Sequence, residues 1–248
     1  MLPPFVHDTL RWLRNETVLP AGSGGQSPDD GIPADAGAGA YAAPLAAGIA
    51  GACGAAALLA CHFLRLPSFA VAAVTLLALA AVRGFRLESG TVRGGDRLAG
   101  TAGTGTAVLM LLLLAETAAL AGLVVYHTPR AALALIAATI FGSTASIVFR
   151  LTQPARPLEE IGDTRPSHST ALQGLMVVTI VVCTALLLPV FRIGVTAAAF
   201  VAALCAFVCV VTIARNQQAD DVPDCAALAG KAAEVAALLA ILAFVEAS

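Results

Sequence analysis

The stretch GTAVLMLLLLAETAALAGLVVY, residues 105–126, decides the fold class of this chain. Within it only Glu116 carries a charge. An α-helix needs about 20 predominantly apolar residues to cross the hydrocarbon core of a bilayer. Residues 105–126 meet this requirement, so we expect them to form a transmembrane helix.

The rest of the chain has the same character. Hydrophobic residues make up 58% of the 248 residues, charged residues 12%, and the mean hydropathy is +0.86. A soluble domain carries about 25% charged residues. We therefore predict an all-α, polytopic membrane protein with about seven transmembrane helices, at residues 41–64, 67–82, 105–126, 130–149, 171–191, 193–214 and 226–247. The segment 67–82 is the shortest of these.

Residues 1–40 differ from the remainder. They are polar and rich in Gly, Pro and Asp, which is not the pattern of a secretory signal peptide. Residues 5–19 are expected to form an amphipathic helix on the membrane surface, and residues 21–40 a flexible linker. We predict a cytoplasmic N-terminal segment over 1–40 and a membrane domain over 41–248.

The arginines predict the orientation. With the N-terminus inside, the outer loops hold three: Arg65, Arg130 and Arg192. The inner segments hold ten: Arg11, Arg14, Arg83, Arg86, Arg93, Arg97, Arg150, Arg156, Arg165 and Arg215. Cytoplasmic loops carry an excess of Lys and Arg. The distribution predicts a multi-pass protein of the cell membrane with its polar, potentially active face toward the cytoplasm.

Three charged residues lie within predicted spans, where charge is expensive, rather than at their ends: Glu116, Lys231 and Glu234. Lys231 and Glu234 lie three residues apart, on one helix face, and are expected to pair. The pair either packs against a neighbouring helix or places Glu234 beside a polar cavity open to the cytoplasm. Glu116 is expected to make a structural hydrogen bond to a Ser or Thr on another helix.

The inner segments hold 13 of the 16 acids, five of them in residues 1–40. The inner loops offer three acid-bearing groups: Glu88 and Asp96; Glu159, Glu160 and Asp163; and Asp220, Asp221 and Asp224. Converging carboxylates suit Mg²⁺, which prefers oxygen ligands and often bridges to phosphates, and interspersed arginines suit phosphate oxygens. The groups are either a site for a phosphorylated or nucleotide-bearing substrate or ordinary solvated loops.

Cysteine and histidine give no sign of a transition-metal site. None of the six cysteines forms a CxxC pair, and Cys205 and Cys209 are expected to pack as small apolar side chains. The four histidines show no ligand spacing.

The order of these features resembles the cobalamin synthase family, the adenosylcobinamide-GDP ribazoletransferases. The segment ETVLPAG at residues 16–22 is similar to the family's early Leu-Pro segment. The segment GFRLESGTVRGGD at 84–96 stands where the family carries Gly-Leu-His-Leu-Asp-Gly-Leu-Ala-Asp-Thr-x-Asp-Gly. Near the end, VPDCAALAGKAAE at 222–234 stands at the family's Gly-Asp-x-Leu-Gly-Ala-x-x-Glu.

Several positions depart from the family pattern. Glu88 replaces the first signature aspartate, and Arg86 stands at the histidine. Val92 and Gly95 occupy the other two aspartate positions, with Asp96 one step beyond the second of these. In the C-terminal motif Gly230 and Glu234 match, while Ala227 stands at the aspartate and Asp224 lies about one turn away.

The resemblance implies a Mg²⁺-dependent, membrane-bound transferase. It would join adenosylcobinamide-GDP to α-ribazole and release GMP, so its partners would be phosphorylated corrinoid and nucleoside substrates and the lipid bilayer, with no nucleic acid. A homo-oligomer is compatible with the sequence. The implied catalytic residues are Glu88 and Asp96, and the implied phosphate contacts are Arg83, Arg86 and Arg93. The implied metal ligands are Glu88, Asp96, Asp224 and Glu234.

Two alternatives stay open. The replaced aspartates also fit a catalytically inactive paralogue that binds a corrinoid or partner enzymes. The apolar spans also fit an unrelated small transporter, although no matched pair of Gly- or Pro-broken helices marks two repeated halves.

Overall fold

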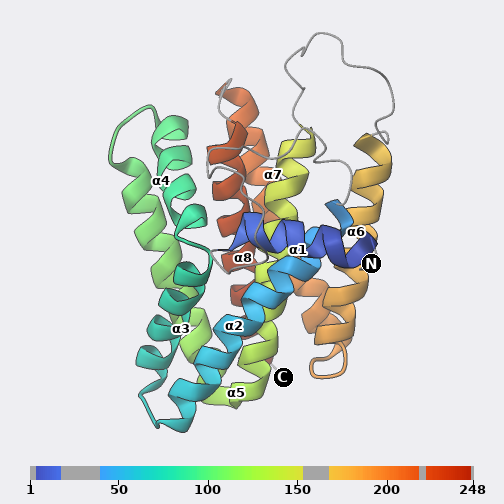
Figure 1. Cartoon of the computed structure of the whole chain (residues 1–248). Coiled ribbons are helices and arrows are strands. Elements are labelled where there is room, and N and C mark those ends of the chain that lie inside the picture. Colours follow the sequence, from blue (N-terminus) through green and yellow to red (C-terminus); the bar gives the residue numbers. More distant parts are fainter. Residues whose placement is uncertain (1–3, 18–39, 153–167, 218–221, 247–248) are drawn as a thin grey trace.

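The computed structural model describes residues 4–17, 40–152, 168–217 and 222–246, and within them every regular element is helical. The all-α prediction is confirmed for these residues. The predicted linker and the acids Glu159, Glu160, Asp163, Asp220 and Asp221 lie outside the described residues. The elements are α1 (Pro4–Glu16), η1 (Ala40–Ala42), α2 (Ala43–Phe63), α3 (Ser68–Val82), α4 (Arg86–Ala99), α5 (Thr104–Thr152), α6 (His168–Leu187), α7 (Ile193–Asn216) and α8 (Val222–Glu246) (Figure 1).

Five helical stretches of the described chain are long and apolar enough to cross a membrane. They are Ala40–Phe63, Thr104–Thr152, Thr170–Leu187, Ile193–Asn216 and Pro223–Glu246, and the bent pair of α3 and α4 would make a sixth. At 1.5 Å per residue, the 15 residues of α3 extend only about 22 Å, less than the hydrocarbon thickness of about 30 Å. The segment 67–82 is therefore a helix, as predicted, but is too short to span a membrane alone.

The two spans predicted at 105–126 and 130–149 belong to one element. The 49-residue α5 contains a single non-helical residue, His127 (φ −170°, ψ 106°), two residues before Pro129. Proline removes a backbone donor and disfavours helical geometry in the residue before it, so a break is expected here. Each half of α5 is about as long as one membrane crossing.

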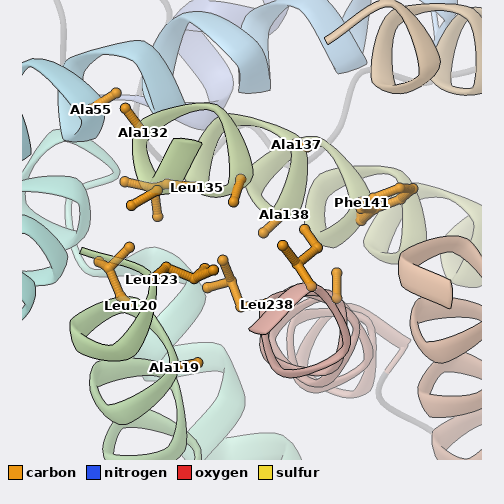
Figure 2. Packing of buried hydrophobic residues seen from close by; sticks show 14 of the residues in the cluster. Ala55, Ala119, Leu120, Leu123, Ala132, Leu135, Ala137, Ala138, Phe141 and Leu238 are labelled. Carbon is orange, nitrogen blue, oxygen red and sulfur yellow. The ribbon is translucent and has the colours of Figure 1, made fainter. Parts of the chain in front are cut away.

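The core lies where both halves of α5 meet α2, α3 and α8. Figure 2 shows Leu120 and Leu123 from the first half, Leu135 from the second half and Leu238 of α8 gathered in this cluster. Many of the other buried residues are alanines. Small side chains let helix backbones approach closely, which is the usual mode of helix packing in membranes. In Figure 1, α8 is flanked by α4, α5 and α7, and it packs against all three.

The predicted amphipathic helix near the N-terminus is present as α1, and its apolar side is partnered by the protein. Trp12 and Leu13 are buried in a cluster with the start of α2, Ile147 of α5 and Leu175 of α6. The hydroxyl of Tyr41 donates a hydrogen bond to Asp8 Oδ2 (2.7 Å). These contacts attach α1 to the bundle.

Candidate functional site

The junction between α3 and α4 is a sharp bend. The two helix axes differ by 91°. Two consecutive residues, Gly84 (φ 63°) and Phe85 (φ 56°), adopt left-handed conformations there. A non-glycine residue with positive φ is uncommon and costs free energy unless surrounding contacts hold it. Arg83, the last residue before the bend, supplies such a contact because its side chain is anchored to α8, as described below.

The charged segment after the bend is a helix rather than the loop expected from the sequence. Residues 86–99 form α4, which packs against α8 and the start of α5. Glycines make the close approach possible. A Cβ at Gly94 would lie 2.5 Å from the carbonyl oxygen of Asp224, and one at Gly95 would lie 2.6 Å from Cα of Gly105. A Cβ at Gly90 would lie 2.6 Å from Cβ of Ala227. Glycine normally disfavours helix, so these close contacts explain why α4 contains three of them.

Four charged side chains form a buried network between the bend, α5 and α8, which we call the inner network: Arg83, Glu116, Lys231 and Glu234. All four side chains are at most 7% exposed. Glu234, the middle residue of α8, accepts hydrogen bonds from Nη1 of Arg83 at both carboxylate oxygens (3.2 and 3.1 Å). The ammonium of Lys231 lies 2.5 Å from Glu116 Oε2 and 3.6 Å from Glu234 Oε2.

The inner network is electrically balanced, with two cations and two carboxylates. The predicted pairing of Lys231 with Glu234 is confirmed, whereas the Ser or Thr partner expected for Glu116 is wrong, because Lys231 takes that position. The hydroxyl of Thr139 lies 3.4 Å from Glu234 Oε1 but is closer to its own helix, at 2.8 Å from the carbonyl of Leu135. Mutual neutralisation lets these four charges lie within an apolar bundle.

A second charged group, the outer cluster, comprises Arg93, Arg97 and Asp224. Nε of Arg93 lies 2.9 Å from Asp224 Oδ1, and Nε of Arg97 lies 3.6 Å from Oδ2. The arginine side chains are 59% and 44% exposed, whereas Asp224 is only 12% exposed. Two guanidinium groups share one carboxylate, so the cluster carries a net positive charge with donors that remain accessible to solvent. Guanidinium groups of this kind recognise phosphate well.

The remaining sequence-predicted residues are dispersed along α4. Asp96 Oδ1 accepts a hydrogen bond from the backbone N–H of Gly105 (2.7 Å), which satisfies an otherwise unpaired donor at the start of α5. Glu88 is 9% exposed, and its Oε2 has no hydrogen-bond partner among the described residues. Arg86 is exposed at the start of α4.

The four predicted metal ligands do not converge on one position. Asp224 and Glu234 are ten residues apart in α8, about 15 Å along the axis, and Glu88 and Asp96 are about 12 Å apart along α4. A Mg²⁺ ion binds its ligands at 2.0–2.1 Å, so the four carboxylates cannot all bind one ion. Among the described residues no three His, Cys, Asp or Glu side chains gather as a metal site. The outer cluster offers one carboxylate, Asp224.

The structure thus brings together two segments that are more than a hundred residues apart. Arg83, at the bend before α4, meets Glu234 of α8, and Arg93 of α4 meets Asp224 of α8. Sequence reasoning did not include Arg97 in the site. Its position four residues after Arg93, on the same helix face, was the available signal, but it required knowing that the segment is helical.

Comparisons of the chain with protein-family models, with curated proteins and with solved structures gave no match. The two charged groups are therefore the features of the structure that bear on function. The inner network is closed to solvent and its charges are paired. The outer cluster is accessible and cationic, and is suited to binding an anionic group.

Proposed function

We propose that this chain is a membrane-bound transferase of cobalamin biosynthesis that joins adenosylcobinamide-GDP to α-ribazole with release of GMP. The single observation that supports this best is the outer cluster, where Arg93 and Arg97 flank Asp224 at the accessible end of the α4–α8 contact. The resemblance to cobalamin synthases implies that these same two segments act together. When a diphosphate-bearing substrate binds, its phosphate oxygens would replace the carboxylate of Asp224 as the partners of Arg93 and Arg97.

In this proposal Mg²⁺ would supply charge neutralisation on the substrate phosphates, held by Asp224 and by the phosphates themselves. Arg93 and Arg97 would orient the diphosphate. Glu88, buried on α4 with an oxygen free of described partners, is the candidate to accept the proton of the attacking hydroxyl. Arg83 and Glu234 would hold the α3–α4 bend against α8 rather than touch substrate.

The proposal includes a membrane topology. The two halves of α5, the α3–α4 pair and helices α2, α6, α7 and α8 would make seven crossings. With the N-terminus inside, the outer cluster would face the cytoplasm, where a charged corrinoid nucleotide is available. The exposed Arg192, between α6 and α7, would then lie on the opposite side.

A catalytically inactive, corrinoid-binding relative is the second candidate. One observation favours it: both acids that α8 contributes, Asp224 and Glu234, are already paired with cations of this chain. In this case the outer cluster would bind the nucleotide without turning it over.

The experiment supplies membranes containing the full chain with adenosylcobinamide-GDP, α-ribazole and Mg²⁺, and measures GMP and cobalamin. The variants Glu88→Ala and Asp224→Asn test the proposed groups, and Arg192→Gln is the matched control for a charge change outside the cluster. Product from the parent and the control, with loss in both tested variants, supports the transferase. Absence of product with the parent, in membranes where a cobalamin synthase is active, refutes it.

Binding of adenosylcobinamide-GDP to purified protein separates the two candidates. Binding without product, weakened by Arg93→Gln and unaffected by Arg192→Gln, supports the inactive relative. Absence of both binding and product rejects a corrinoid function altogether.

A further inference from the structure

The structure contains an apolar groove that neither charged group uses. It lies between α6 and α7, with α5 and α8 as its floor, and encloses a cavity of about 220 Å³. Although α6 and α7 are consecutive, they make little contact with each other, whereas each packs against α5 or α8. The rim is formed by apolar side chains that are roughly half exposed: Met176, Ile180, Val201 and Leu204.

The lining excludes a polar ligand. Its only hydroxyl groups belong to Thr144 and Thr179, which hydrogen-bond to each other (2.8 Å). Thr179 also lies 2.8 Å from the carbonyl of Leu175. These hydroxyls are therefore satisfied within the protein. An occupant would gain only by burying hydrocarbon and by contact with the rings of Phe141 and Phe200, which pack edge to face at 4.8 Å.

The shape of the groove indicates an elongated apolar occupant. Helices α5, α6, α7 and α8 all contribute to its lining, and its rim of apolar side chains is exposed. An unbranched hydrocarbon chain is narrow enough, and acyl chains surround α6 and α7 if these helices cross a membrane.

The position of Arg215 indicates where the phosphate headgroup of a lipid would lie. Arg215 follows Leu204 by eleven residues on α7, which places both on nearly the same helix face, about 16 Å apart along the axis. Arg215 is exposed, and no hydrogen bond or ion pair joins its guanidinium to a described residue. Arginine near the end of a membrane helix attracts lipid phosphate.

We propose that the α6–α7 groove binds one acyl chain of an anionic phospholipid whose phosphate lies at Arg215. The apolar lining, whose two hydroxyl groups are already hydrogen-bonded within the protein, and the exposed arginine toward one end of the groove together define this ligand. The site is separate from the outer cluster and does not depend on the transferase proposal.

Native mass spectrometry of the full chain in mild detergent tests the proposal. The protein is supplied with phosphatidylglycerol or with phosphatidylcholine of identical acyl chains. We expect a retained phosphatidylglycerol adduct, reduced about tenfold or more in Val201→Trp, which covers the groove from an exposed position. Val74→Trp is the matched control, because Val74 is also exposed but lies on α3. Arg215→Gln should abolish the preference for phosphatidylglycerol.

Two results would overturn the proposal. One is an adduct of equal strength in the parent and in Val201→Trp; the other is a protein dimer that Val201→Trp dissociates, which would make the groove an interface between copies. A diazirine-bearing phosphatidylglycerol, cross-linked to the unmodified parent, provides a readout that needs no variant. Cross-links concentrated at Met176 and Leu204 support the site, and cross-links spread evenly over the exposed helices contradict it.

Discussion

Replacing Lys231 by methionine is the sharpest test of the inner network. The lysine is the only cation that contacts Glu116 among the described residues and is a second cation beside Glu234. Methionine keeps a similar side-chain length but removes the charge. Two buried carboxylates, Glu116 and Glu234, would then have Arg83 as the one remaining cation of the network. Breaking a buried ion pair by removing one partner costs about 3–5 kcal/mol. We expect the free energy of unfolding to fall by this amount.

The measurement is equilibrium unfolding of the purified chain in mixed micelles, followed by far-ultraviolet circular dichroism. Arg192→Met is the control, because an exposed arginine should change stability by no more than about 0.5 kcal/mol. The double variant Glu116→Gln, Lys231→Met restores charge balance and should recover part of the loss. If Lys231→Met costs less than about 1 kcal/mol, or if the two single effects simply add, then the contacts seen in the structure do not stabilise the fold.

Three further outcomes follow from the same geometry. Gly94→Ala should destabilise the chain by about 1–3 kcal/mol, because the added Cβ collides with the carbonyl of Asp224, and should weaken the proposed nucleotide binding. Gly194→Ala is the control in the same unfolding assay and should be neutral, because a Cβ at Gly194 meets no atom within 4 Å. Topology reporters fused after Arg97 and after Arg130 should report opposite sides of the membrane, and the same side for both would contradict the crossing by the first half of α5. Under the proposed function, binding of adenosylcobinamide-GDP should weaken as salt increases, because the arginines of the outer cluster are exposed. Calorimetry at two ionic strengths measures this.

The positions of the charged residues explain why the bundle has one arrangement. Apolar helices of similar composition pack in many registers, since Ala and Leu distinguish poorly between neighbours. The inner network is satisfied only when the bend at Arg83, the middle of α8 and Glu116 meet at one level. A shift of α8 by one turn would separate the charges and leave them unpaired in the core. We therefore expect the network to favour this register, at a cost in desolvation.

The sequence by itself determined the all-α class of the protein and the positions of its long apolar helices. Long apolar runs can satisfy their backbone hydrogen bonds in a membrane only as helices, so residues 41–64, 193–214 and 226–247 could be recognised from composition. The break near Pro129 and the pairing of Lys231 with Glu234 were also local, because they depend on residues a few positions apart.

Only the tertiary structure decided the conformation of the charged segment 86–99 and the partners of its side chains. With three glycines and little apolar character, it has no intrinsic preference for helix, and close contact with α8 and α5 stabilises it as α4. The pairs Arg83–Glu234 and Arg93–Asp224 join residues 151 and 131 positions apart. No local pattern encodes such pairs, because each carboxylate is compatible in sequence with any of the arginines. The three-dimensional packing of α4 on α8 selects the partners and separates the buried charges from the accessible ones.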